Sequence, residues 1–156
     1  MRAGGCAVLR GILLANAEPP RLRKKALLLV TDLAAERDPA GGDDELREPA
    51  LLGAVLSLLT SPEGAAPDDD LSEKVLRAMR VYLTAEAPAA AAAAEVFLRG
   101  GADAALRSLR LRLDAAAGDG GDDDGYRAEL SELRDEVAAA LRAAAPPLSG
   151  APRDEL

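Results

Sequence analysis

Acidic side chains are the residues of this sequence whose types and spacing come nearest to a chemical site. The stretch GGDDDGYRAELS, residues 120–131, places Asp122, Asp124 and Gly125 at positions three, five and six of an EF-hand calcium loop. Position one is a glycine instead of an aspartate, and position twelve is a serine instead of the bidentate glutamate. We therefore predict a solvated acidic loop here and no specific metal site.

The side chains that most enzymes use for catalysis are scarce. The chain has no His and one Cys, Cys6, which excludes Ser-His and Cys-His pairs, a thiolate zinc cluster and an internal disulfide. Carboxylates are abundant, but they fall in segments rich in Gly and Pro, where nothing would hold two of them at a fixed separation. No Gly-rich loop follows a strand pattern, so a phosphate-binding motif is not expected. We expect no enzyme activity and no cofactor.

A different signal stands at the C-terminus, where the chain ends in Arg153, Asp154, Glu155 and Leu156. A terminal K-D-E-L or H-D-E-L is recognised by a receptor that returns escaped proteins to the endoplasmic reticulum. Arginine keeps the positive charge of the first position and leaves the rest of the motif intact. The ending predicts the lumen of the endoplasmic reticulum and the retrieval receptor as a partner. The alternative is a polar tail that ends this way by chance.

Two groups of basic residues are candidates for contact with an acidic partner. One group is Arg21, Arg23, Lys24 and Lys25, and the other is Arg99, Arg107 and Arg110. The alternative for each group is the solvated face of a helix. The net charge of −8 argues against nucleic acid, which needs basic stripes. No apolar stretch is long enough to span a bilayer, so membrane insertion is not expected.

The elements that must position these residues are predicted to be helices. Hydrophobic residues make up 49% of the chain but aromatic residues only 2%, which favours helices packed through Leu, Val and Ala over a β-sandwich. Three segments combine Gly or Pro with Asp and are predicted loops: Asp38–Asp44, Ser61–Asp70 and Gly118–Gly125.

Between the loops, apolar residues recur at helical spacing. The stripes are Leu22, Ala26, Leu29, Val30 and Leu33; Leu52, Val55, Leu56 and Leu59; Leu71, Val75, Ala78, Met79 and Tyr82; Phe97, Leu98, Leu106, Leu109 and Leu113; and Tyr126, Leu130, Leu133, Val137, Leu141 and Ala144. The run Ala89–Ala94 fits a helix whose larger side chains have been replaced by alanine. No segment shows sustained strand alternation, so the predicted class is all-α.

The first residues of the chain allow two interpretations. Arg2, an apolar segment and the sequence Ala15-Asn16-Ala17 resemble a signal peptide with its cleavage site. Arg10 and three glycines interrupt the apolar segment where a signal peptide needs continuity. We favour an amphipathic helix, with apolar positions on one side at Val8, Leu9, Ile12 and Leu13.

Two of the predicted helices look like copies of one another. The segments Leu22–Val30 (LRKKALLLV) and Leu71–Met79 (LSEKVLRAM) align without gaps and start forty-nine residues apart. This separation is close to the length of armadillo and HEAT repeats. A Gly-Gly pair opens a helix at Gly4-Gly5 and again at Gly100-Gly101. The spacing predicts an armadillo- or HEAT-like, right-handed helical solenoid.

At this point a family resemblance becomes specific. GGCAVLRGILLANAEPPRLRKKALLLVTDLAAE resembles an armadillo junction, in which a Gly-Gly turn and a third helix lead into the next unit. LRKKALLLVTDLA, DLSEKVLRAM, EVFLRGGADAALRSLRLRL and YRAELSELRDEVAAALRAAAPPL together resemble the armadillo-type nucleotide-exchange factors of heat shock protein 70 chaperones. These include the Fes-type and HspBP-type cytosolic members and the Sil-type member of the endoplasmic reticulum. The similarity runs from about Gly4 to Leu148, and the C-terminal RDEL points to the Sil-type member.

The resemblance implies a monomeric co-chaperone that binds the nucleotide-binding domain of a BiP-like chaperone and promotes ADP release. It also implies that Arg99, Arg107 and Arg110 flank or lie on a helix that lines the concave groove. The competing hypothesis is a general armadillo adaptor without exchange activity. Peptide-binding adaptors present ladders of Asn and Trp, whereas this chain has one Asn and no Trp.

The expected organisation is one repeat array followed by a tail. Residues 1–148 would hold about two and a half repeats, with a closing helix at 126–145, and residues 149–156 would form a flexible tail that carries the retrieval signal. The resemblance implies about four repeats and an N-terminal segment for a complete exchange factor of this type. We therefore expect this chain to be the C-terminal part of a longer protein.

The C-terminal motif generates the first testable prediction. A secreted reporter that has its own signal peptide and ends in APRDEL should be retained in secretory cells, because the receptor recognises the last four residues. The matched control ends in APRDE, without Leu156, and should appear in the medium. Equal secretion of the two reporters, measured by immunoblot, would make the ending an accident.

Overall fold

The computed structural model describes residues 4–15, 19–36, 44–60, 68–116 and 124–145, and these are helical with short connections and no strand. The all-α prediction is confirmed. The helices are α1 (Gly5–Leu14), α2 (Pro20–Glu36), the short 3-10 helix η1 (Asp44–Arg47), α3 (Pro49–Ser57), α4 (Asp69–Leu83), α5 (Ala87–Arg99), α6 (Ala102–Ala116) and α7 (Asp124–Ala144).

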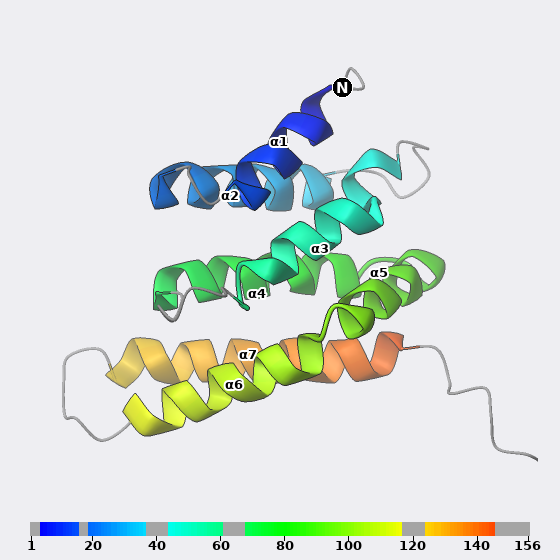
Figure 1. Cartoon of the computed structure of the whole chain (residues 1–156). Helices are drawn as coiled ribbons and strands as arrows, with labels where there is room; N and C mark the ends of the chain where they lie inside the picture. The colour runs from blue at the N-terminus through cyan, green and yellow to red at the C-terminus, as the bar shows by residue number, and fades with distance from the viewer. Residues whose placement is uncertain (1–3, 16–18, 37–43, 61–67, 117–123, 146–156) are drawn as a thin grey trace, which may run out of the picture.

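The helices form two layers (Figure 1). In one layer α4 lies between α2 and α7 and packs against both, while α1, α3, α5 and α6 cross in front of them. The two copied segments, Leu22–Val30 and Leu71–Met79, thus lie on neighbouring helices of the same layer. The helices that follow the Gly-Gly pairs, α1 and α6, both belong to the other layer.

Local sequence explains where several helices begin. Pro49 and Pro88 stand in the first turns of α3 and α5, where the missing N–H costs no hydrogen bond. Asp68 caps α4, and its carboxylate accepts a 2.6 Å hydrogen bond from the backbone N–H of Leu71. Asp69 and Asp70 occupy the first turn of α4, where the helix dipole favours negative charge.

The start of α4 corrects one loop boundary, and the start of α7 corrects another. The loop predicted at Ser61–Asp70 ends before its last three aspartates, which cap or begin α4. The loop predicted at Gly118–Gly125 ends before Asp124, the first residue of α7. Runs of aspartate suit both a loop and a helix N-terminus, so composition alone placed both boundaries too late. The predicted loop Asp38–Asp44 lies almost wholly outside the described residues.

Most of the predicted apolar stripes form the core. On α4, Val75, Ala78, Met79 and Tyr82 are buried, and Leu71 is half-buried. The predicted residues of α3 and its C-terminal turn are buried as well, as are those of α6. On α7, the buried residues include Leu130, Leu133, Val137 and Leu141, while Tyr126 and Ala144 are half-buried.

The first hairpin departs from the prediction in part. On α2, Leu27 is buried in place of Leu29, and both Leu22 and Leu29 are exposed. On α1, Leu9 and Leu13 are buried as predicted, but Val8 is 61% exposed. For α2, the reason is that residues 27–30 are all apolar and lie on every side of the helix. Spacing alone therefore does not identify the buried face of α2.

The buried side chain of Tyr82 makes a hydrogen bond to one element and an aromatic contact with another. Its hydroxyl donates a buried hydrogen bond of 2.9 Å to the carbonyl of Leu46 in η1. Its ring meets that of Phe97 edge to face, with 6.4 Å between centroids. Tyr82 therefore ties α4 to η1 and α5.

Two glycines should respond in opposite directions to the same substitution. Gly101, at the turn between α5 and α6, has φ of +86°, which L side chains rarely adopt. Gly101→Ala should lower the free energy of unfolding by about 1 kcal/mol. Gly53 lies inside α3, and a Cβ added there meets nothing within 4 Å. Gly53→Ala should raise the free energy of unfolding by about 0.5–1 kcal/mol.

Urea unfolding followed by circular dichroism would measure both changes. Equal effects of the two substitutions would contradict the assignment of the α5–α6 turn.

Candidate protein-binding surfaces

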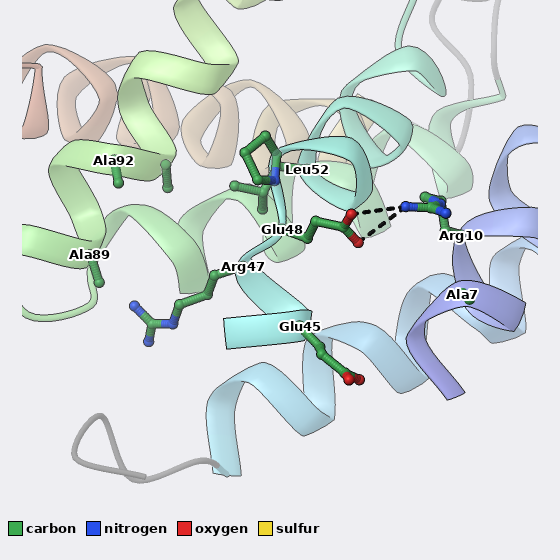
Figure 2. A pocket seen from close by; sticks show the side chains of 10 residues that line it. Ala7, Arg10, Glu45, Arg47, Glu48, Leu52, Ala89 and Ala92 are labelled. Atoms are coloured by element: carbon green, nitrogen blue, oxygen red, sulfur yellow. Dashed lines mark hydrogen bonds and ion pairs between the residues drawn. The ribbon is translucent and has the colours of Figure 1, made fainter. Parts of the chain in front are cut away.

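A groove opens between α1, η1, α3 and α5 (Figure 2). Its volume is about 670 Å³. The lining residues are Ala7, Arg10, Glu45, Arg47, Glu48, Pro49, Leu52, Ala89, Ala92 and Ala93. None of the basic residues proposed from sequence is among them.

The groove combines an apolar surface with charged residues. Arg10 of α1 donates hydrogen bonds of 3.0 and 3.1 Å to the two carboxylate oxygens of Glu48, which precedes α3. The small alanines of α5 leave space that larger side chains would fill. This arrangement suits a protein segment with apolar and charged side chains, and it offers no His or thiolate for covalent chemistry.

Sequence reasoning missed this groove, although its parts were visible. Arg10 stood out because it interrupts an apolar segment, and Ala89–Ala94 stood out as an alanine run. The structure brings the two together across α3, which neither periodicity nor composition could reveal. Arg10 and Glu48 are 38 positions apart, and no pattern in the sequence indicated that they are hydrogen-bond partners.

The basic cluster of α2 divides into two parts. Lys24 is held by ion pairs of 2.9 Å to Asp68 and 2.7 Å to Asp70, and only 24% of its side chain is exposed. Arg23 is half-buried, with its Nε inside the protein. Arg21 and Lys25 face solvent. Arg21 and Lys25 are thus the two residues of the cluster that are exposed to a partner.

The other three arginines are all exposed. Arg99 pairs with Glu95 within α5, and Arg110 lies 3.5 Å from Asp114 within α6. Arg107 takes part in none of the ion pairs among the described residues. Leu111, 70% exposed, follows Arg110 directly. We call Arg107, Arg110 and Leu111 the α6 patch.

The N-terminus of α4 carries a network of ionised groups. Asp69 lies 3.3 Å from Arg112 of α6 and 3.8 Å from Arg127 of α7. Asp70 binds Lys24 of α2 and Lys74 of its own helix. The network therefore joins α4 to three other helices.

From the sequence, nothing was expected to hold two carboxylates at a fixed separation. This expectation is wrong for residues 68–70, whose carboxylates are held by the helix N-terminus and by cations of other helices. The hydrogen bonds from Lys24 and Lys74 lower the pKa of Asp70. Glu73 accepts a 2.8 Å hydrogen bond from the hydroxyl of Tyr126, and this bond lowers the pKa of Glu73. A general acid at neutral pH needs a raised pKa, so these two carboxylates act as structural anions.

The EF-hand frame is incompatible with the helix that occupies it. Asp124–Ser131 lies within α7, whereas positions five to twelve of the motif must mostly curl around the ion. The residues before Asp124 in that frame lie outside the described residues. In the parts of the chain that are described, no three His, Cys, Asp or Glu residues are placed to hold a metal ion. Within the same ranges, no helix has both the length and the apolar character of a bilayer crossing.

The network at α4 generates a prediction about acid. Because the folded pKa of Asp70 lies below its unfolded value, the stabilisation is present above about pH 4 and is lost as pH falls through the folded pKa. Asp70→Asn should therefore lower the free energy of unfolding at pH 7. The difference from the natural chain should shrink as the pH falls below about 4.

Urea unfolding at several pH values would measure this difference. Exposed Glu129 is the control, and Glu129→Gln should leave the curve close to that of the natural chain. A difference for Asp70→Asn that stays constant from pH 7 to pH 3 would show that its ion pairs contribute nothing.

Comparisons with known proteins gave no match: no protein-family model matches the chain, and neither a curated protein nor a solved structure does. The family that the sequence segments resemble is therefore a proposal, as is the function that it implies.

Proposed function

We propose that the chain is an adenyl-nucleotide exchange factor, a co-chaperone, for a heat shock protein 70 chaperone of the endoplasmic reticulum. The observation that carries the proposal is the placement of Leu22–Val30 and Leu71–Met79, the segments that resemble this family. They lie on α2 and α4, which pack side by side in one layer. Neighbouring copies in equivalent positions are what a stack of armadillo-like repeats requires. An armadillo-like, right-handed solenoid is part of this proposal.

Exchange in this proposal is a matter of binding and not of covalent chemistry. The factor promotes ADP release if it binds the open, nucleotide-free form of the nucleotide-binding domain more tightly than the ADP-bound form. By linkage, ADP then weakens binding of the factor by the same ratio. The ionised carboxylates at α4 fit this view, because their lowered pKa values favour structural roles over proton transfer.

The α6 patch is the proposed contact with the chaperone. Arg107 and Arg110 lie three residues apart on one face of α6, so both can act on one acidic surface. Exposed Leu111 beside them adds an apolar contact. Arg99, at the end of α5, is close in sequence and also exposed. Residues 149–156, which the sequence analysis assigns to a tail with the proposed retrieval signal, lie outside the described residues.

The test measures release of labelled ADP from a purified BiP-like chaperone. The folded chain should speed release, and excess ADP should weaken the complex. Arg107→Glu should reduce the effect by roughly five- to tenfold, and Arg107→Glu with Arg110→Glu should reduce it further. Arg142 of α7 is also exposed, so Arg142→Glu makes the same charge change and should have little effect.

An unchanged release rate with a folded chain would overturn the exchange proposal. Equal effects of the Arg107 and Arg142 reversals would retain exchange but reject the α6 patch as the contact.

A second candidate, an adaptor without exchange activity, is favoured by the groove between α1, α3 and α5. The groove has a volume of about 670 Å³ and is lined on the α5 side by alanines, which leaves room for side chains of a bound segment. An adaptor would form a stable complex with a partner while leaving ADP release unchanged. The Ala92→Arg substitution would fill the groove and abolish that binding without affecting the α6 patch.

A further inference from the structure

Apolar exposure is concentrated at one end of the molecule. Among the described residues, the exposed large hydrophobic side chains of the first hairpin are Val8, Leu14, Leu22, Leu28 and Leu29, and the rest of the fold adds only Leu111. Figure 1 shows that α2 ends its layer, with α4 on one side of it. The helix at the other end, α7, exposes charged residues such as Glu132 and Arg142. One end of the stack is thus polar, and the other exposes leucines.

The exposed face of α2 has a regular charge order. Arg21, Lys25, Leu28, Asp32 and Glu36 recur every three or four residues, and all five are exposed. The basic residues lie in the N-terminal half of this face and the acidic residues in the C-terminal half. Leu28 and Leu29 occupy the middle. We call these residues, together with Leu22, the α2 face.

These charges oppose the stability of α2 when it stands alone. Arg21 and Lys25 are like charges four residues apart, and so are Asp32 and Glu36. Basic residues near a helix N-terminus and acidic residues near its C-terminus also oppose the helix dipole. The first turn of α2 contains no acidic residue, and its last turn contains no basic residue. None of the four charges takes part in an ion pair among the described residues.

An antiparallel copy of the same helix would satisfy this arrangement. A two-fold axis between Leu28 and Leu29 places Arg21 opposite the partner's Glu36 and Lys25 opposite the partner's Asp32. The same axis sets the central leucines of the two copies against each other. A parallel arrangement would instead bring like charges together.

We propose that the α2 face binds a second copy of this chain, in an antiparallel and isologous dimer. The dimer continues the layer of α2, α4 and α7 through the partner's α2. This inference departs from the monomer expected from the sequence, and it stands independently of the proposed exchange activity. A helix of 17 residues is roughly 25 Å long, which makes the contact smaller than a standard interface. The dimer should therefore be weak and depend on concentration.

Charge reversal with a matched restoration tests the proposal. Arg21→Glu with Lys25→Glu makes the α2 face wholly acidic, and Asp32→Lys with Glu36→Lys makes it wholly basic. Each variant alone should have a dimer dissociation constant at least about tenfold higher than the natural chain, because four opposite-charge contacts become like-charge contacts. An equimolar mixture of the two variants should form a heterodimer, since every contact across the axis is then between opposite charges.

Sedimentation equilibrium from about 1 to 500 μM measures the association, and circular dichroism confirms that each variant is folded. Restored association in the mixture would support pairing through the charges of the α2 face, because a loss of folding in the variants could not produce it. The weaker association of each variant alone tests the antiparallel order, because a parallel pair of natural chains already sets like charges against each other. A natural chain that is monomeric over the whole range would overturn the proposal. Variants that dimerise like the natural chain, or a mixture that stays monomeric, would overturn it as well.

Discussion

The packing of α4 between α2 and α7 is the interaction on which the rest of the structure depends. Its buried side chains Val75, Leu76, Met79 and Tyr82 are at most 2% exposed. They contact helices of both layers, so burial of this one apolar face joins segments that lie far apart in the chain. With few aromatic residues available, close packing of Leu, Val, Met and Ala must supply most of the core.

The polar contacts around α4 add orientation to that packing. Asp69 and Asp70 begin the helix, where the dipole favours them, and they also reach cations on α2, α6 and α7. Exposed ion pairs contribute little individually, but a network anchored at a helix N-terminus opposes sliding of one helix along another. The hydrogen bond from Tyr82 to Leu46 has the same effect for η1.

Surfaces that are left exposed by this core have different chemical characters. The groove beside α3 mixes alanines with charged residues, the α6 patch is basic, and the α2 face is apolar with opposite charges at its two ends. The proposals made for these surfaces assign each of them a different partner: a bound segment for the groove, a chaperone for the α6 patch and a second copy of the chain for the α2 face.

The sequence by itself determined the helical class and most of the buried stripes, because periodicity acts within a few residues. Only the tertiary structure decided that Leu27 is buried and Leu29 exposed, since the whole run from Leu27 to Val30 is apolar. It also decided that Lys24 is held in ion pairs while its neighbour Lys25 faces solvent. The groove formed by Arg10, Glu48 and the alanines of α5 likewise required three segments to meet. The physical reason is that packing against neighbouring helices determines which face of a helix is buried. The buried face in turn determines which side chains of other helices each residue contacts.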